Sequence, residues 1–530
     1  MSAFNSLPLF PLALFLITAT LLQLWLLYRY RYWHRRKVPF LQPTMFLGNL
    51  KPLLLLRTSF GDYFHSLYAE PSLKSAPFFG FFILHTPALL IRDPQLIEQL
   101  LIKEFNSFPN RFEAAELQSD PMGALTLPLA KYAIWRKSRR EISKLFTTGH
   151  IKKKMYPKLV TIAEQLEGYI TRKLIQKYAH STADASGAIV IEVKEMCALY
   201  TTDVTAELLY SVDTGGLRND GCEMRAQCKQ LFRPSLRKII DFFVIFFLPR
   251  AVRALNSKLF TRQYSNYLRR LVKEHIKKEG NYDRDSGDLI DLLLKMQQTL
   301  ADTPLNIWLR HPDFIAAQVG IFLLAGFETS SSLIAFILFE LAKQPKIQQK
   351  LKTELAAYTS TESCNVSYKK VLNMPYLNMV VAEGLRLYPT APFINRECLP
   401  HSQQQTLWYD KETKYLIIPK DVPAYVSILG IHRDSKYWPN PQFFDPERFA
   451  PENLPSIKPM TYIPFGAGPH GCVGSRLGIL QVKLGLTYIL RKYRVEVCER
   501  TVNEIRFDPK RFMLEAESEL YLKFVKDELC

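Results

Sequence analysis

The apolar stretch from Leu7 to Tyr28 constrains the fold of this chain most, because it is long enough to cross a membrane. No charged residue occurs among residues 1–28, and 22 residues in a helix would span about 33 Å, enough for the hydrocarbon core of a bilayer. Tryptophan and tyrosine mark its end, and five basic residues follow: Arg29, Arg31, Arg35, Arg36 and Lys37. Such a boundary indicates the cytosolic end of a membrane helix.

A cleaved signal peptide is the alternative interpretation of this stretch. It would need positive charge before the apolar run, a shorter apolar core and a small-residue cleavage site, and none of these is evident. We therefore predict a transmembrane signal anchor over residues 1–28. A basic connector over residues 29–45 follows, stiffened by Pro39 and Pro43, and everything beyond it lies on the cytosolic face.

Composition limits what the rest of the chain can be. Hydrophobic residues make up 48% of the 530 residues and charged residues 22%, which is typical of a packed globular protein and excludes a mainly disordered chain. The eight cysteines are scattered without a C-x-x-C pair, so neither a disulfide framework nor a structural zinc site is expected. The net charge of +19 leaves nucleic acid, an anionic membrane surface and an acidic protein partner open.

Helical periodicity dominates the first 350 residues of the chain. Apolar residues recur at three- and four-residue spacing over Lys158–Tyr178 and Tyr264–Lys278, and short strand-like pieces such as Tyr415–Ile418 follow Pro389. No Gly/Ser linker, low-complexity block or repeat divides the sequence. We predict a single, mainly α domain with a small β part over residues 46–530.

Two further apolar segments could be mistaken for membrane spans. In the helix predicted from Asp313 to Lys343, the apolar part is too short to span a bilayer and Glu328 interrupts it, which favours a helix buried in the core. The segment Ile239–Leu248 is broken by Asp241 and flanked by basic residues. A membrane-surface helix and a buried helix are equally compatible with that pattern.

The segment Phe465–Gly474 is the most specific chemical signal. Four glycines and a proline in ten residues cannot form a regular helix or strand, so they predict a tight loop with exposed backbone N–H groups. Cys472 lies in this loop, just before a helix predicted to begin near Ser475. Amide hydrogen bonds and a helix N-terminus would lower the pKa of its thiol, as a soft anionic metal ligand requires. A buried structural cysteine is the alternative.

The segment Ala325–Ser330 lies in the middle of the predicted core helix. Glu328 and Thr329 there conflict with burial and with helix preference, and such conflicts are expected at functional sites. Gly326 would let a flat cofactor approach the helix backbone. Alternatively, Thr329 bonds back to its own helix and Glu328 finds a salt bridge.

Two weaker patterns complete the set. Glu383 and Arg386 form an E-x-x-R pair, which alone is usually a solvated helix pair. Trp135 and Arg139 lie four residues apart, so they share one helix face.

Together these segments resemble the cytochrome P450 family, and they occur in that family's order. The loop is similar to F-x-x-G-x-R-x-C-x-G, the helix segment matches [AG]-G-x-[DE]-T-[ST], and the E-x-x-R pair is followed by a P-E-R-F segment that contains Arg448. The pair Trp135 and Arg139 matches W-x-x-x-R. Among members of the family, the chain most resembles the insect microsomal ones.

The resemblance implies the cytochrome P450 fold and haem b as cofactor, with Cys472 as the axial ligand of the iron. Such a thiolate pushes electron density toward O–O cleavage. Glu328 and Thr329 would organise the water that delivers protons, and Glu383, Arg386 and Arg448 would form a structural cluster near the haem. The expected cofactor-binding residues are Cys472, Trp135, Arg139, Arg396, His470, Phe465 and Gly468.

His470 departs from the pattern of the family, which has arginine there to pair with a haem propionate. A neutral imidazole offers one uncharged hydrogen bond in its place. Arg139 and Arg396 would then carry more of the propionate charge, and we expect haem binding to be retained but weaker.

The expected function is a membrane-anchored haem-thiolate monooxygenase of the endoplasmic reticulum, or microsome, with its catalytic domain in the cytosol. It would insert one oxygen atom from O2 into an apolar small molecule, either a xenobiotic such as an insecticide or plant toxin or an endogenous hormone or lipid. NADPH would supply electrons through NADPH-cytochrome P450 reductase, with cytochrome b5 as a further candidate partner, because no dinucleotide-binding glycine motif follows a strand here. The alternatives are a haem-thiolate isomerase or dehydratase and a non-catalytic, membrane-tethered haem- or ligand-binding protein.

The positive charge is concentrated in two places. Residues 29–37 contribute +5, and residues 131–154 contribute nine basic residues against one acidic residue, Glu141. The first cluster lies at the membrane exit and the second contains the Trp135–Arg139 helix, on the face where the family docks its acidic reductase. This placement favours a membrane and an acidic redox partner, and nucleic acid is not expected.

Overall fold

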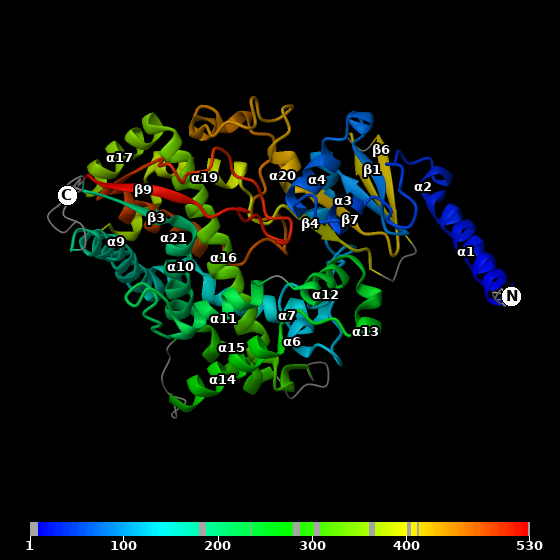
Figure 1. Cartoon of the computed structure of the whole chain (residues 1–530), viewed down its shortest axis with the longest axis horizontal. Helices are drawn as coiled ribbons and strands as arrows, with labels where there is room; N and C mark the ends of the chain where they lie inside the picture. Colours follow the sequence, from blue (N-terminus) through cyan, green and yellow to red (C-terminus); the bar gives the residue numbers. More distant parts are fainter. Residues whose placement is uncertain are drawn as a thin grey trace, which may run out of the picture.

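The apolar N-terminal run forms α1 (Leu9–Tyr30), which projects from the body of the protein (Figure 1). The computed structural model describes residues 9–179, 187–233, 235–278, 287–300, 308–359, 366–399, 404–410 and 413–527. Of the most apolar window of α1, only 6% is buried against the rest of the chain, whereas the corresponding share for α16 (Phe314–Lys343) is 72%. The helix α1 is therefore available to lipid, and α16 is a core helix, as predicted.

Helices make up most of the domain, with the central helix α16 packed against α10 (Val193–Tyr210), α14 (Arg262–Lys278) and α21 (Ser475–Leu490). Side chains from these helices form the larger hydrophobic core. The other helices are α2 (Tyr32–Arg35), α3 (Lys51–Leu54), α4 (Phe60–Tyr68), α5 (Pro94–Glu98), α6 (Pro121–Ala124), α7 (Tyr132–Ile142), α8 (Thr148–His150), α9 (Tyr156–Ala179), α11 (Glu223–Phe232), α12 (Leu236–Phe247), α13 (Val252–Leu255), α15 (Leu289–Leu300), α17 (Pro345–Thr359), α18 (Tyr368–Leu372), α19 (Pro375–Leu387) and α20 (Ile428–His432).

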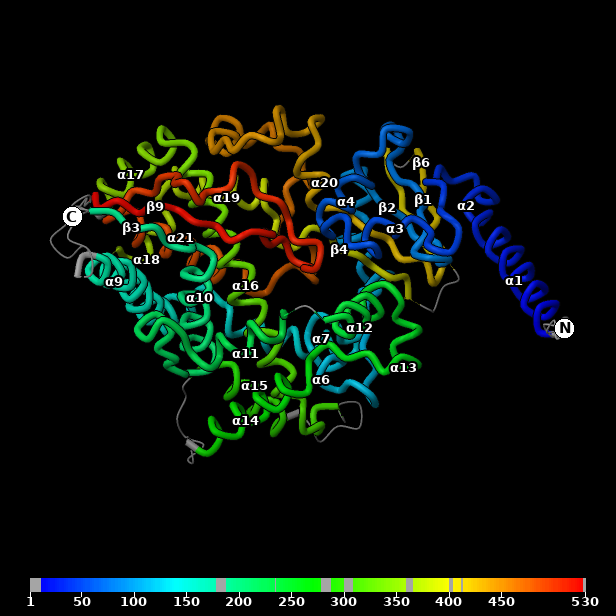
Figure 2. The backbone as a smooth tube through the Cα atoms, viewed as in Figure 1, coloured from blue at the N-terminus to red at the C-terminus, as the bar shows by residue number. Residues whose placement is uncertain are grey.

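The largest sheet joins segments that are far apart in the sequence, in the order β1-β2-β7-β4. Strands β1 (Phe78–Ile83) and β2 (Thr86–Ile91) form an antiparallel hairpin, β2 pairs in parallel with β7 (Ala424–Ser427), and β7 pairs antiparallel with β4 (Phe393–Arg396). Figure 2 shows this N-terminal segment in blue beside the later strands. A second hydrophobic core lies against this sheet.

Two smaller sheets complete the β part. Strand β9 (Tyr521–Lys526) lies between β3 (Ala188–Glu192) and β8 (Tyr493–Glu496), and β5 (Gln404–Tyr409) pairs with β6 (Lys414–Pro419). The predicted mainly α domain with a small β part is confirmed, as are the helices expected near residues 158–178, 264–278 and 313–343.

The helix α12 covers the ambiguous segment Ile239–Leu248, and neither interpretation describes it alone. Val244, Ile245 and Phe247 are buried, while Leu236 and Ile240 are exposed. Asp241 is buried and pairs with Arg237 across one helical turn. The helix thus packs on the domain with one apolar face and turns other apolar side chains outward.

Candidate functional site

The loop from Phe465 to Gly474 forms as predicted, and its glycines have definite roles. Gly466 and Gly468 both have φ +70°, the left-handed region that glycine adopts without strain. A Cβ at Gly468 would lie 2.0 Å from the carbonyl oxygen of Leu101, so no side chain fits there. The N–H of Cys472 donates to the Phe465 carbonyl at 2.9 Å, which closes the loop just before α21 begins at Ser475.

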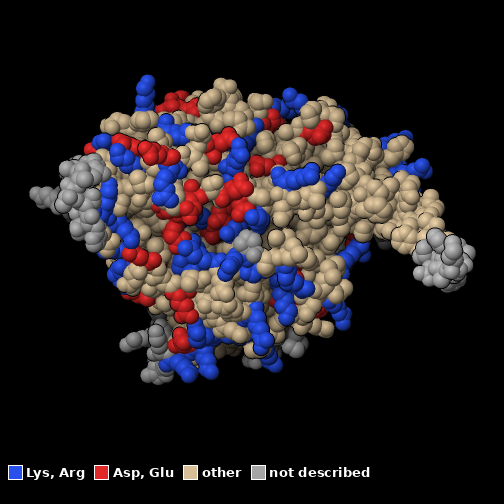
Figure 3. Space-filling model, viewed as in Figure 1, with Lys and Arg blue, Asp and Glu red and all other residues tan. Residues whose placement is uncertain are grey.

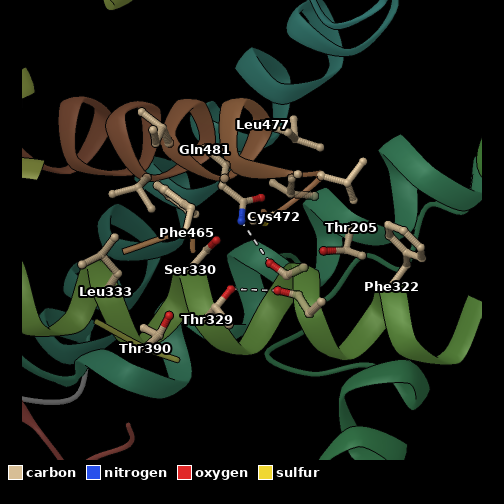
Figure 4. Close-up of a pocket in the computed structure, with 18 of the residues that line it drawn as sticks. Thr205, Phe322, Thr329, Ser330, Leu333, Thr390, Phe465, Cys472, Leu477 and Gln481 are labelled. Atoms are coloured by element: carbon tan, nitrogen blue, oxygen red, sulfur yellow. Dashed lines mark hydrogen bonds between the residues drawn. The ribbon is translucent and has the colours of Figure 1, made fainter. Parts of the chain in front are cut away.

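The Cys472 thiol faces a cavity between α16 and the loop with α21 (Figure 4). The cavity has a volume of about 130 Å³, and its lining is mostly apolar. Cys472 is deep in the protein, yet its side chain is exposed, because the exposure is to this cavity. The cavity residues on α16 include Ala325, Thr329 and Leu333, which oppose the cysteine.

The predicted lowering of the thiol pKa is wrong for the uncoordinated side chain. Burial raises the pKa of the Cys472 thiol above its usual value, although the Gly474 N–H and the Arg139 and Arg111 guanidinium groups act to lower it. The thiol alone is therefore neutral at physiological pH. A bound metal ion would change this, because a coordinating thiol is deprotonated outright.

Thr329 and Glu328 leave α16 in different directions. Thr329 lines the cavity, and its hydroxyl donates to the Ala325 carbonyl at 2.8 Å (Figure 4). Glu328 does not line the cavity. Its carboxylate accepts from Lys194 of α10 at 2.5 Å, and Lys194 also donates to Ser331 at 2.8 Å. Both contacts of the alternative interpretation, a back-bonded threonine and an ion-paired glutamate, thus occur in the structure.

Gly326 has a packing role that was not predicted. A Cβ at this position would lie 2.6 Å from Thr205 Oγ1 of α10, so glycine permits the close crossing of α10 and α16. Its carbonyl accepts from Gln481 of α21 at 3.0 Å, which ties both walls of the cavity together (Figure 4). The glycine therefore serves helix packing first, and it also borders the cavity.

Three arginines gather behind the cysteine loop. Arg139 of α7 donates to the Gly471 carbonyl at 2.7 Å, and Arg111 donates to the Pro128 carbonyl at 2.9 Å. Arg396 of β4 is buried, and its Nε has no hydrogen-bond partner among the described residues. Burial lowers the pKa of Arg396 to about 9. One carboxylate, that of the buried Glu113, lies near them, 3.7 Å from Arg111 Nε.

His470 is buried beside this cluster and packs against Trp135, with ring centroids 4.0 Å apart and the ring planes tilted by 39°. Burial and the neighbouring Arg111 and Arg396 lower its pKa to about 2, so the ring is neutral. Nε2 lies 2.7 Å from the Pro109 carbonyl oxygen, which can only accept, so Nε2 carries the hydrogen. The single N–H of the ring is already used, and Nδ1 is left with a lone pair.

The E-x-x-R pair is buried, as the resemblance implied. Arg386 donates two hydrogen bonds of 2.7 Å to the Glu383 carboxylate, and neither side chain has any exposed surface. Arg386 also donates to the carbonyls of His432, Pro441 and Phe443. Arg448 approaches Glu383 to 3.3 Å. The cluster thus fastens α19 to the irregular segment that leads to the cysteine loop.

The model of the cytochrome P450 family matches residues 38–524 of this chain. The chain belongs to the cytochrome P450 family. It is 50% identical over 519 residues to "Probable cytochrome P450 6t3" of Drosophila melanogaster, with 97% of this chain and 99% of that protein covered. It is 40% identical over 509 residues to "Probable cytochrome P450 6v1" of the same species, with 94% of this chain and 96% of that protein covered. With "Cytochrome P450 6k1" of Blattella germanica it shares 33% identity over 528 residues, 96% of each protein. The predicted resemblance to insect members is confirmed.

Haem is the cofactor of this family, and the residues of this cytochrome P450 fit it. The thiol faces a cavity with mostly apolar walls, which suits a flat porphyrin and its iron. At one edge, the guanidinium groups of Arg111, Arg139 and Arg396 lie together, and among the described residues the carboxylate that acts on them is that of Glu113, which leaves a surplus of positive charge. The two propionates of haem would match that surplus, and Arg396 Nε would gain the partner that it lacks.

Arg111 and Lys194 are residues of this region whose roles sequence reasoning missed. Arg111 belongs to a Phe105-x-x-Phe108-x-x-Arg111 pattern in the sequence. Nothing in that pattern indicates that its guanidinium group contacts the cysteine loop, at the His470 carbonyl. Lys194 carries no sequence signal, because it comes from a helix 134 residues away from Glu328.

Replacing His470 by arginine should slow haem loss. A guanidinium can donate to the Pro109 carbonyl and to a propionate together, which the neutral ring cannot do. One added charge-assisted hydrogen bond is worth about 1.5 kcal/mol, or roughly tenfold in the rate of haem transfer to an apo-protein acceptor. An unchanged rate of transfer and unchanged haem content would show that position 470 does not limit haem retention.

Proposed function

We propose that this protein is a membrane-anchored monooxygenase that inserts one atom of O2 into an apolar small molecule, with electrons from NADPH delivered by a separate reductase. The observation that carries the proposal is the placement of the Cys472 thiol and the Thr329 hydroxyl on opposite walls of one mainly apolar cavity, inside a chain of this family. When bound, haem supplies the oxygen-activating chemistry that no side chain can provide.

The chain's own residues would bind and orient the haem and supply protons. Cys472 would ligate the iron, and Arg111, Arg139 and Arg396 would bind the propionates. The Thr329 hydroxyl would hold the water that gives up protons inside the cavity. Glu328 does not line the cavity, and its carboxylate pairs with Lys194 on the other side of α16, so it would act on the cavity by its charge and not by direct contact with the water.

The walls of the cavity support an apolar substrate. Most of its lining side chains are aliphatic or aromatic, among them Phe146, Leu209, Phe322 and Leu333. Burial of apolar substrate surface there would be favourable by about 25 cal/mol per Å². A xenobiotic such as an insecticide or plant toxin, or an endogenous hormone or lipid, has the chemistry to bind in such a site.

Replacing Thr329 by alanine should uncouple NADPH consumption from product formation. Without the hydroxyl in the cavity, proton delivery loses its ordered water, so more of the reducing equivalents should leave as hydrogen peroxide. Product per NADPH and peroxide release, measured with the reconstituted reductase, check this. Ser330→Ala, at a second hydroxyl bordering the cavity, is the matched control and should keep its coupling. Unchanged coupling in Thr329→Ala would contradict the proton-delivery role.

For location, we propose the endoplasmic reticulum membrane, with the domain on the cytosolic face. The support is the exposed α1 and the basic residues at 29–37 that follow its apolar part. Among them, Arg35 lies 3.9 Å from the Tyr28 ring and Arg36 lies 4.0 Å from the Tyr32 ring. Basic and aromatic side chains in this combination anchor a helix end at the cytosolic headgroups.

The second basic cluster supports docking of an acidic redox partner such as NADPH-cytochrome P450 reductase, with cytochrome b5 as a further candidate. It surrounds α7, whose Arg139 points inward to the Gly471 carbonyl, so the cluster covers the cysteine side of the site. Its exposed members are Lys131, Arg136, Arg140, Lys144, Lys152, Lys153 and Lys154.

Charge reversal in this cluster should weaken the reductase interaction. For the double variant Arg136→Glu and Lys153→Glu we expect the reductase concentration for half-maximal turnover to rise several-fold, and its dependence on salt to become shallower. Lys74→Glu is the control, at an exposed position shortly before β1, and it should leave the reductase concentration for half-maximal turnover unchanged. Equal effects of the two changes would contradict docking at this cluster.

A further inference from the structure

Three side chains of the kind that bind metal ions meet where α14 ends and α15 begins. His275 lies in the last turn of α14, Asp288 directly precedes α15, and Asp291 lies in its first turn. One imidazole nitrogen and one oxygen of each carboxylate lie within 4.8 Å of one another. None of the three residues lines the cavity of Cys472, so this cluster is separate from the site described above.

The cluster is buried, although it contains two carboxylates. His275 is 6% exposed and Asp288 is 2% exposed. The exposed positions of α14 include basic residues, namely Arg262, Arg269, Arg270, Lys273 and Lys277. Figure 3 shows basic side chains along the lower edge of the molecule, where α14 lies in Figure 1. The two carboxylates thus lie beneath a basic surface and do not belong to a solvated acidic face.

The distances within the cluster fit ligands of one ion. His275 Nε2 lies 3.6 Å from Asp288 Oδ2 and 3.6 Å from Asp291 Oδ1. Both distances exceed the roughly 2.7–3.2 Å of an N–H···O hydrogen bond. Two atoms that ligate a tetrahedral zinc ion at about 2.1 Å each are separated by about 3.4 Å. The observed spacing is therefore closer to that of metal ligands than to that of hydrogen-bond partners.

The start of α15 orients the Asp288 carboxylate toward the imidazole. Asp288 Oδ1 accepts the backbone N–H of Asp291 at 3.0 Å, and Oδ2 is the oxygen turned toward His275. Hydrogen bonds of this kind hold a ligand side chain in place for a metal ion. Asp288 and Asp291 are three residues apart, so both carboxylates lie on one side of the first turn.

Neighbouring helices enclose the cluster. Gly287, directly before Asp288, has φ +68°, and a Cβ there would lie 3.1 Å from His150 Cε1 of α8. Glycine thus permits both the turn into α15 and the close approach of a second imidazole. The helix α15 also packs against α7 and α16. A link between α14 and α15 would therefore fix a corner at which several helices meet.

Charge within the cluster favours a cation. Two carboxylates face one imidazole, so negative charge is in excess even when the imidazole is protonated. Buried charge is costly unless an opposite charge or a metal ion balances it. An imidazole ligand suits zinc and similar transition metals, whereas magnesium and calcium take oxygen ligands.

We propose that His275, Asp288 and Asp291 bind one zinc ion, which holds the end of α14 to the start of α15. Three protein ligands leave the fourth position of the tetrahedral ion to water. The proposal does not depend on the proposed function, because it concerns residues outside the cavity of Cys472.

Zinc uptake by the full-length, haem-loaded protein tests this proposal. The protein is treated with a chelator, dialysed at a fixed micromolar concentration of free Zn²⁺, and analysed for zinc and iron. We expect about one zinc ion per chain, and its loss in His275→Gln and in Asp291→Asn. The controls His34→Gln and Asp213→Asn, at exposed positions outside the cluster, should keep the zinc. Iron content reports bound haem and checks that each variant is folded.

Two measurements on the zinc-loaded protein identify the ligands and the structural role. X-ray absorption at the zinc edge is separate from that of the haem iron. It should show nitrogen and oxygen ligands at about 2.0–2.2 Å, with outer scattering from an imidazole and no sulfur. Zinc should also raise the thermal midpoint of the unaltered protein by a few degrees and leave that of Asp291→Asn unchanged.

The unaltered protein alone can overturn the proposal, even where a variant fails to fold. A protein that takes up no zinc would show that a protonated imidazole pairs with the two carboxylates without a metal ion. Sulfur among the zinc ligands, or equal zinc uptake by the unaltered protein and both cluster variants, would place the ion elsewhere. Tighter binding of Mg²⁺ or Ca²⁺ than of Zn²⁺ would contradict the class of metal.

Discussion

Replacing Cys472 by serine should abolish monooxygenase activity, with turnover falling to the background rate. The thiol is the soft ligand atom that faces the cavity, and the Cys472 backbone N–H closes the loop on the Phe465 carbonyl. Serine keeps the backbone hydrogen bond and the approximate side-chain size, but a hydroxyl is a hard, weakly acidic ligand that does not replace a thiolate. The measurement is product formation with reconstituted reductase, together with haem content per polypeptide.

A second cysteine provides the control for this change. Cys498 follows β8, its partners are Thr501 and the Tyr521 carbonyl, and it does not line the cavity. Cys498→Ser should retain haem and turnover. If Cys472→Ser kept substantial NADPH-dependent turnover, the assignment of the axial ligand would fail.

Replacing Arg386 by methionine should have the largest effect on stability. The change leaves the Glu383 carboxylate short of its bidentate partner and strands three carbonyls inside the protein. Removing one partner of such a buried pair costs about 3–5 kcal/mol, a large share of the roughly 5–15 kcal/mol that stabilises most domains. We expect little haem-loaded protein and a marked fall in the denaturant midpoint of what remains.

A surface ion pair sets the scale for comparison. Glu504 and Arg506 are 71% and 77% exposed, and Glu504→Gln should change the free energy of unfolding by no more than about 1 kcal/mol. Loss of stability in Arg386→Met no larger than in Glu504→Gln would show that the buried cluster does not hold the segment around the cysteine loop.

The sequence predicts those parts of the protein whose structure is determined by residues close to one another in the chain. The glycines of the cysteine loop, the start of α21 and the length of α16 follow from turn chemistry and from apolar periodicity, so they can be found without coordinates. The pairing of Glu383 with Arg386 is equally local, since the two residues lie three apart on one helix.

Features that depend on distant segments could not be predicted. The requirement for glycine at position 326 comes from Thr205, and the direction of Glu328 is set by Lys194, both on α10. The state of His470 depends on the Pro109 carbonyl and on two arginines, Arg111 and Arg396. Even the direction of the Cys472 pKa shift was wrong, because the loop pattern shows the N–H groups but not how deeply the folded domain buries the thiol.

The absorption spectrum of the purified full-length protein, reduced and bound to carbon monoxide, tests the central claim most directly. Haem held by Cys472 in this cavity predicts the shifted Soret band of a thiolate-ligated haem, and Cys472→Ser should lose it. A band typical of a histidine-ligated haem, or a protein that takes up no haem at all, would contradict the account of this site.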